Sequence, residues 1–144
     1  MLGGEAPIDH AQRRALRQKG SLHPLIERVM RIHVTEEARH LSFAEVALRE
    51  RVPRLGAGRR AWLALRVPLI MGEMSRRMLQ APGWLAEAYA IPAAVRRAAY
   101  AGPVHRAQLR EGVAKVYALA DELGLIGPLS GRIWRAYHLA PRAD

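Results

Sequence analysis

The sequence predicts an all-α fold in a single domain over residues 1–144. No segment combines strict apolar alternation with β-branched or aromatic enrichment, so β-strands are not expected. Proline and glycine turn signals instead divide the chain into stretches whose apolar residues recur at helical spacing. Hydrophobic residues make up 50% of the sequence, which argues against disorder and is enough for one modest core.

The turn signals place each helix. Pro7 is expected in the opening turn of a first helix that runs through Arg17. Ser21 offers a cap for a long helix over residues 22–51, in which Pro24 occupies the first turn. The later helices are predicted over residues 58–79, with a bend near Pro68, and over residues 84–89, 92–100, 103–123 and 130–138.

The net charge of +10 is the first feature that bears on partners, because a basic chain often binds nucleic acid. Here the positive charge is almost all arginine, since Lys19 and Lys115 are the two lysines. The arginines are dispersed in pairs and form no single tract. We therefore favour a solvated basic surface, and we rank nucleic-acid binding last among the alternatives. The pairs are Arg13-Arg14, Arg59-Arg60, Arg76-Arg77 and Arg96-Arg97.

Cysteine is absent, which excludes disulfides, thiolate metal sites and a thiol nucleophile. The start of the chain lacks the basic and apolar regions of a signal peptide. The longest apolar stretch, residues 61–74, is interrupted by Arg66, Pro68 and Glu73 and is shorter than the roughly 20 apolar residues of a membrane span. We expect a cytoplasmic protein without a membrane partner.

One stripe of the long helix carries side chains that bind metals. At about 100° per residue, His33, Glu37 and His40 fall within roughly 60° of one another. Glu37-x-x-His40 is the spacing with which helical carboxylate proteins hold two irons or manganeses. Ile26 and Met30 lie toward the same side, which predicts that the stripe faces a core. The alternative is an exposed stripe stabilised by pairs within the helix.

A longer segment around this stripe resembles a known family. Residues 22–25, Leu-His-Pro-Leu, and above all residues 32–40, Ile-His-Val-Thr-Glu-Glu-Ala-Arg-His, are similar to the p-aminobenzoate N-oxygenase (AurF-like) di-iron family. The resemblance implies a ferritin-like helical protein that oxidises arylamines with dioxygen at a di-iron centre. It also implies that His33, Glu37 and His40 are metal ligands. Glu36 and Arg39 are then expected beside these ligands or at the surface.

The same resemblance implies a carboxylate ligand on the preceding helix, somewhat under thirty residues before the first histidine. Glu5 lies 28 residues before His33, and Asp9 is the other nearby carboxylate. The alternative for Glu5 is a frayed terminal residue. The resemblance is strongest over residues 5–80, which correspond to the C-terminal half of the family's core. Residues 84–144 fit its helical tail more loosely.

The sequence departs from the family's pattern in one respect. The family has an earlier helical region with a glutamate and a first Glu-x-x-His pair, and no second Glu-x-x-His occurs in these 144 residues. We therefore expect a fragment or truncated homologue with an incomplete ferritin-like bundle and weak or mononuclear metal binding. Downstream of the stripe, none of the glutamates is followed by a histidine three residues later; they are Glu45, Glu50, Glu73, Glu87, Glu111 and Glu122.

Two function classes remain open. In the first, the chain is an oxidoreductase when the missing half is present or a partner supplies it. It would then use two irons, or manganese, with dioxygen and an arylamine or other small organic substrate. Self-association into a homodimer would bring two Glu-x-x-His motifs together. In the second, the chain is a non-catalytic helical interaction or scaffold module that retains the ancestral helices.

The other histidines, tryptophans and methionines carry weaker signals. His23, directly before Pro24, is expected to be structural. The remaining expectations are surface positions for His10, His105 and His138, core or interface positions for Trp62, Trp84 and Trp134, and core positions for Met71, Met74 and Met78.

Overall fold

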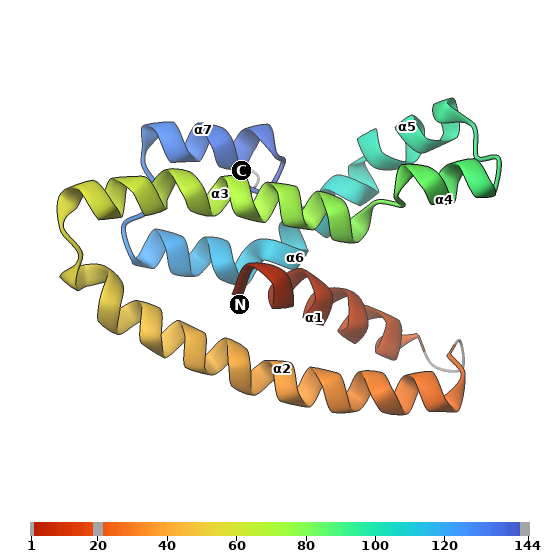
Figure 1. Ribbon diagram of the computed structural model, residues 1–144, viewed down its shortest axis with the longest axis horizontal. Coiled ribbons are helices and arrows are strands. Elements are labelled where there is room, and N and C mark those ends of the chain that lie inside the picture. Colours follow the sequence, from red (N-terminus) through yellow and green to blue (C-terminus); the bar gives the residue numbers. More distant parts are fainter. Residues whose placement is uncertain (1, 19–21, 142–144) are drawn as a thin grey trace.

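The computed structural model describes residues 2–18 and 22–141, and within them it contains helices and no strand (Figure 1). The predicted all-α fold class is confirmed, and most helix ends lie within two residues of the predicted ones. The elements are α1 (Leu2–Arg17), α2 (Pro24–Arg51), the 3-10 turn η1 (Val52–Arg54), α3 (Ala57–Leu79), α4 (Gly83–Ala88), α5 (Ala93–Ala101), α6 (Pro103–Glu122) and α7 (Pro128–Ala136).

The predicted start of the first helix is wrong. Helix α1 begins at Leu2, so Pro7 lies inside it and not in its opening turn. A proline inside a helix removes one backbone hydrogen bond, and packing offsets that loss here. Pro7 is fully buried, and its Cα lies 3.6 Å from the position that a Cβ on Gly112 of α6 would occupy. The missing side chain of Gly112 thus lets α1 lie close to α6.

Helix α2 is capped by His23. The side chain of His23 accepts a hydrogen bond from the backbone N–H of Leu25 at 3.3 Å, which confirms a structural role for this histidine. The cap expected from Ser21 lies outside the described residues. Helices α1 and α2 run antiparallel, and α1 lies between α2 on one side and α6 and α3 on the other (Figure 1).

The hydrophobic core lies mainly among α3, α6 and α7. Trp134 of α7 is fully buried, and its ring packs edge-on against Tyr117 of α6 with the ring centroids 5.1 Å apart. Met71 is also buried, as predicted. Trp62 and Trp84 are exposed, so the core alternative is wrong for them and the interface alternative stays a prediction.

The three histidines expected at the surface lie in three different environments. His105 is buried, and its ring lies 5.2 Å from that of Tyr100, so the surface prediction is wrong for it. His10 is half-buried, with its Nε2 3.4 Å from Glu111, a carboxylate partner that its sequence neighbours do not indicate. His138 is exposed, as expected.

Helix α2 leaves much of its apolar surface uncovered. Only Glu37 and Leu41 are buried among its 28 residues, all of which the structure describes. We call the exposed hydrophobic side chains the outward α2 face. Since these side chains recur at helical spacing, this is the surface of an amphipathic helix that lacks a partner here. The face consists of Leu25, Ile26, Val29, Ile32, Phe43 and Val46.

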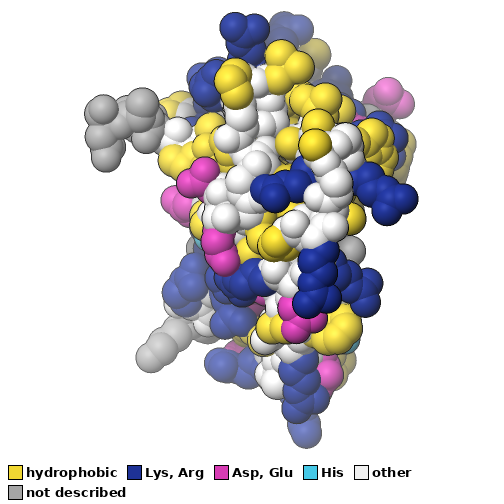
Figure 2. Space-filling view, turned by 90° about the vertical axis from the view of Figure 1, so that its left-hand side faces the viewer, with side chains coloured by type: hydrophobic (Ala, Val, Ile, Leu, Met, Phe, Trp, Pro, Cys, Tyr) yellow, Lys and Arg dark blue, Asp and Glu magenta, His cyan; other side chains and the backbone are white. Residues whose placement is uncertain are grey.

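The surface shows how the positive charge is distributed. On the face drawn in Figure 2, Lys and Arg side chains are scattered among exposed hydrophobic ones and do not form one tract. Among the described residues, no helix combines the length and the apolar character needed to cross a membrane.

Candidate metal centre

Two antiparallel stripes of polar side chains face each other between α1 and α2. The stripe on α2 is His33, Glu37 and His40, and the stripe on α1 is Glu5, Asp9 and Gln12. Both follow the same spacing of four and then three residues, which keeps the side chains on one face of a helix. Because the helices are antiparallel, Glu5 meets His40 at one end and Gln12 meets His33 at the other.

Two histidine–carboxylate contacts form within these stripes. His40 Nδ1 lies 3.4 Å from Glu5 Oε1, which joins α2 to α1. His33 Nδ1 lies 3.3 Å from Glu37 Oε1, one turn along the same helix. The Gln12 amide also lies against His33, with its Nε2 2.9 Å from His33 Nδ1. Each of the two histidine–carboxylate contacts brings together an imidazole nitrogen and a carboxylate oxygen, the ligand types that iron and manganese accept.

Glu37 is the most confined carboxylate of the cluster. The residue is 4% exposed, and burial raises the pKa of its carboxyl above the ordinary value. The nearby His33 opposes this rise, while the carboxylates of Asp9 and Glu5 add to the raised pKa. One oxygen each of Glu37 and Glu5 is buried without a hydrogen-bond partner among the described residues. Such orphaned oxygens are costly, and a bound cation would satisfy them.

Asp9 has a different partner. It is buried, and both of its carboxylate oxygens accept hydrogen bonds from Arg13 Nε, at 2.7 and 2.9 Å. An aspartate paired with arginine in this way is already neutralised within α1. Of the two carboxylates that the sequence offers on this helix, it is therefore Glu5 that meets a histidine of α2.

The expected ligands do not close into one cage. Within the described ranges, no group of three or more histidine and carboxylate side chains is arranged to hold a metal ion. The side chains of His33 and His40 are 52% and 56% exposed, so the expectation that the stripe faces a core is correct for Glu37 and wrong for both histidines. Glu36 lies at the surface and contacts Arg39 at 3.3 Å. The nitrogen and oxygen ligand types and the orphaned oxygens fit a metal ion. The ligands of α1 and α2, however, would surround such an ion on one side only.

Sequence reasoning missed three neighbours of the stripe, namely Asp9 as a buried charge, its partner Arg13, and Gln12 beside His33. The signal was available, because residues 5, 9 and 12 repeat the spacing of residues 33, 37 and 40. What the sequence alone could not supply was the antiparallel pairing that sets the two stripes against each other.

Comparison with known proteins decides the family. The model of the family described as p-aminobenzoate N-oxygenase AurF matches residues 1–124. The chain belongs to this family. The resemblance expected from residues 32–40 is thereby confirmed, together with the assignment to an oxygenase family of the di-iron type.

Relatives in mycobacteria extend the comparison. The chain is 43% identical over 136 residues to the uncharacterized protein Rv0885 of Mycobacterium tuberculosis (strain ATCC 25618 / H37Rv) and to the uncharacterized protein Mb0909 of Mycobacterium bovis (strain ATCC BAA-935 / AF2122/97). Each match covers 94% of this chain and 40% of the relative, so the chain spans less than half the length of these relatives. No solved structure matches the chain.

Proposed function

We propose that α1 and α2 supply one side of a di-iron centre at which dioxygen oxidises a small organic substrate. The observation that carries this proposal is the facing of Glu5 and Glu37, with their orphaned buried oxygens, toward the imidazoles of His40 and His33. Family membership supports iron, since the family is one of di-iron enzymes. An arylamine is the substrate class that the family's description suggests, and it is part of the proposal.

The chemical tasks of these residues follow from their surroundings. Bound iron supplies dioxygen activation, which no side chain performs alone. Glu37 and Glu5 provide hard, anionic oxygens, and His33 and His40 complete the donor set with neutral nitrogens. Because the pKa of the Glu37 carboxyl is raised, this carboxyl holds its proton more tightly than usual, and a metal ion must displace that proton to bind. The amide of Gln12 joins α1 to His33 of α2, and Arg13 neutralises Asp9 within α1.

The outward α2 face supports the view that this is one side of a larger site. Its hydrophobic side chains flank the two half-exposed histidines on the same helix, and Phe43 is 71% exposed. We propose that further helices cover this face and add the remaining ligands. In the longer relatives, the unmatched part of the protein would supply them. For this chain by itself, a second copy packed through α2 would do so.

Metal content of the purified chain tests the proposal. After anaerobic loading with Fe(II) and gel filtration, inductively coupled plasma mass spectrometry should find at most one iron per chain. Glu37→Gln should reduce that content at least about tenfold, the usual scale for loss of a ligand or its direct support. Glu36→Gln is the matched control, because it removes the neighbouring carboxylate from the exposed surface. Two tightly held irons per monomer, or equal losses in the two variants, would contradict the proposal.

The choice of metal is tested in the same preparation. Carboxylate and imidazole donors also accept Mn(II), so loading with equal amounts of the two ions shows which one the site retains. We expect iron to be retained in excess, because Fe(II) binds nitrogen and oxygen donors more tightly than Mn(II) does.

A non-catalytic helical module is the second candidate, and one observation favours it. Within the described residues no three ligands form a cage. On this alternative, the chain would retain no metal after gel filtration, and His33→Ala together with His40→Ala would leave folding and partner binding unchanged. Metal retention that depends on these histidines excludes it.

A further inference from the structure

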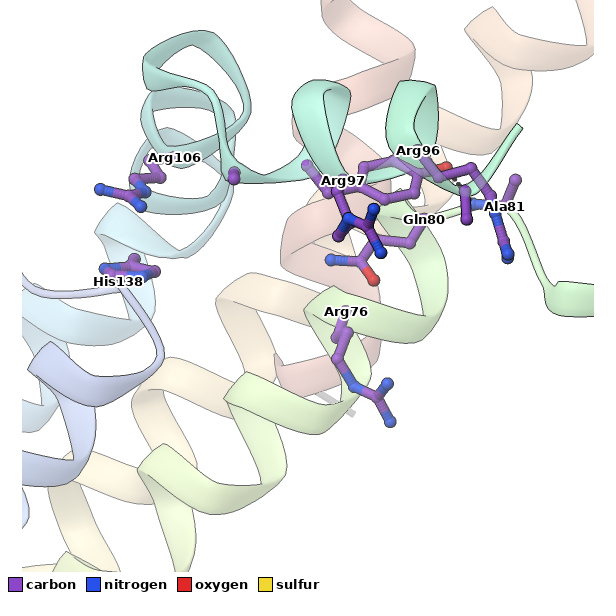
Figure 3. Close-up of a pocket in the computed structure, with 10 residues that line it drawn as sticks. Arg76, Gln80, Ala81, Arg96, Arg97, Arg106 and His138 are labelled. Atoms are coloured by element: carbon purple, nitrogen blue, oxygen red, sulfur yellow. Dashed lines mark hydrogen bonds between the residues drawn. The ribbon is translucent and has the colours of Figure 1, made fainter. Parts of the chain in front are cut away.

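A cationic hollow lies away from the α1–α2 cluster, where the C-terminal end of α3 meets α5 and the start of α6 (Figure 3). Its volume is about 670 Å³, within the range of sites that hold small organic molecules. Five of its ten lining residues are arginine or histidine, and none is aspartate or glutamate. The basic residues are Arg76 from α3, Arg96 and Arg97 from α5, Arg106 from α6, and His138 after α7.

Three of these arginines have no counter-charge. Arg76 contacts Glu73 at 3.0 Å, but no carboxylate lies within 4.0 Å of the side-chain nitrogens of Arg96, Arg97 or Arg106 in the described part of the chain. Arg96 Nε is also buried without a hydrogen-bond partner there. A buried cationic donor left without an acceptor is costly, and an anion is the group that relieves that cost.

The helices add to the positive potential of the hollow. Arg96 and Arg106 lie in the first turn or just beyond it in α5 and α6, and neither first turn contains an acidic residue. The N-terminal end of a helix carries partial positive charge and normally favours carboxylates there. Arginines at two such ends therefore add to the partial positive charge of the helix ends, whereas acidic residues at these positions would offset it.

The remaining polar groups of the hollow can also donate to an anion. The Tyr100 hydroxyl accepts a hydrogen bond from the backbone N–H of Ala81 at 2.8 Å, which leaves its own proton free for a ligand. The Gln80 amide approaches His105, with 3.3 Å between Gln80 Nε2 and His105 Nε2. His138 has a left-handed backbone with φ +59°, an unusual conformation for a residue other than glycine.

The basic side chains fall into two groups. Figure 3 shows Arg106 and His138 on one side of the hollow and Arg96 and Arg97 on the other. A single small anion would satisfy one group and leave the other uncompensated. Arginine pairs planar forks of N–H donors with phosphoryl or carboxylate oxygens, and such bonds are about twice as strong as neutral ones.

We propose that this hollow binds a small molecule with two phosphoryl groups, one held by Arg96 and Arg97 and the other by Arg106 and His138. The site is separate from the candidate metal centre, because the two sets share no residue and the hollow is formed by α3, α5, α6 and the segment after α7, whereas the metal centre lies between α1 and α2. It gives the chain a second ligand whether or not a metal binds between α1 and α2.

Isothermal titration with inorganic pyrophosphate at 0.15 M NaCl tests the proposal, with inorganic phosphate as the one-group comparison. We expect one pyrophosphate per chain, bound at least about tenfold more tightly than phosphate, the effect of 1.4 kcal/mol of additional contact. Arg96→Gln with Arg97→Gln should weaken pyrophosphate binding at least about tenfold. Arg51→Gln with Arg54→Gln is the control, because it removes the same charge from exposed positions outside the hollow.

Three results would overturn the proposal: no binding at this salt concentration, several weak sites per chain, or equal losses in the hollow and control variants. The last two would indicate adventitious attraction to the basic surface. A sedimentation assay with phosphatidylcholine vesicles that contain phosphatidic acid tests whether the phosphoryl groups belong to a lipid headgroup or to a free small molecule. We expect no co-sedimentation that depends on Arg96 and Arg97, and its observation would contradict a small-molecule ligand.

Discussion

The longest helix, α2, and the core helix α6 differ sharply in how they are packed. Helix α2 has 28 residues, and Glu37 and Leu41 are the two that are buried. Helix α6 has 20 residues, and its buried set is His105, Leu109, Gly112, Val113, Val116, Leu119 and Ala120. Helix α6 is thus stabilised by neighbours on several sides, whereas α2 rests chiefly on α1.

This difference separates the helices that stabilise the fold from the helices that carry the candidate ligands. Burial of apolar side chains among α3, α6 and α7 supplies most of the folding free energy. The α1–α2 pair instead buries carboxylates, which cost free energy until a counter-charge neutralises them. A site whose groups are unsatisfied without a ligand is what a metal-binding helix pair requires.

The largest expected effect contrasts a core aromatic with one on the outward α2 face. Trp134→Ala should lower the free energy of unfolding by about 3–5 kcal/mol, because it leaves a cavity in the core. Phe43→Ala should change it by less than about 0.5 kcal/mol, because the ring is exposed. Urea unfolding of dilute protein measures both. A cost for Phe43→Ala near that of Trp134→Ala would show that a second copy already covers α2 at the concentration used.

A second contrast lies within α3. The ring of Tyr137 lies directly against Gly72, on the side where a Cβ would project, so Gly72→Ala should lower the free energy of unfolding by about 1–3 kcal/mol through overpacking. Nothing lies within 4 Å of a Cβ at Gly58, so Gly58→Ala should raise stability by about 0.5 kcal/mol through reduced chain entropy. Thermal unfolding followed by circular dichroism distinguishes the two. Equal effects would mean that α7 does not pack on α3 as described.

A third contrast concerns Glu37, where the expected effect of a substitution on stability has the opposite sign to its effect on metal binding. Because the pKa of this carboxyl is raised in the fold, the fold favours its protonated form. Its stabilising contribution is present below the ordinary value of 4.5 and is lost as the pH rises through the raised pKa. Glu37→Gln should therefore raise the stability of metal-free protein at pH 7 by about 1 kcal/mol.

The pH dependence provides the check on that variant. The gain of Glu37→Gln over the wild-type chain should shrink as the pH falls toward 4.5, since the wild-type carboxyl then becomes neutral as well. Glu36→Gln, at an exposed position, should show neither the gain nor its pH dependence. A loss of stability in Glu37→Gln at pH 7 would mean that its contact with His33 outweighs burial.

Local signals in the sequence predicted the helices well, and non-local packing explains what they missed. Proline and glycine positions predicted most helix ends. The start of α1 was predicted wrongly at Pro7, because the burial that tolerates this proline inside the helix depends on Gly112, more than a hundred positions away. The stripe of His33, Glu37 and His40 was readable from spacing. The exposure of its histidines was not, since it depends on how much of α2 other helices cover.

The same reasoning applies to the rest of the site. Glu5 was proposed through the family pattern, and the antiparallel α1–α2 pairing places it against His40. Asp9 could not be separated from Glu5 by sequence, because only the structure shows that Arg13 already neutralises it. The cationic hollow draws residues from α3, α5, α6 and the segment after α7, so no single stretch of sequence contains its pattern.

The most direct test of the metal half-site uses the six histidines of the chain as internal reporters. Imidazole nitrogen-15 NMR spectra recorded during an anaerobic Fe(II) titration should show selective broadening of the His33 and His40 signals at substoichiometric metal. The signals of His10, His23, His105 and His138 should remain sharp. Broadening that begins at any of those four, or that spreads evenly over all six, would contradict the assignment of α1 and α2 as one side of the metal centre.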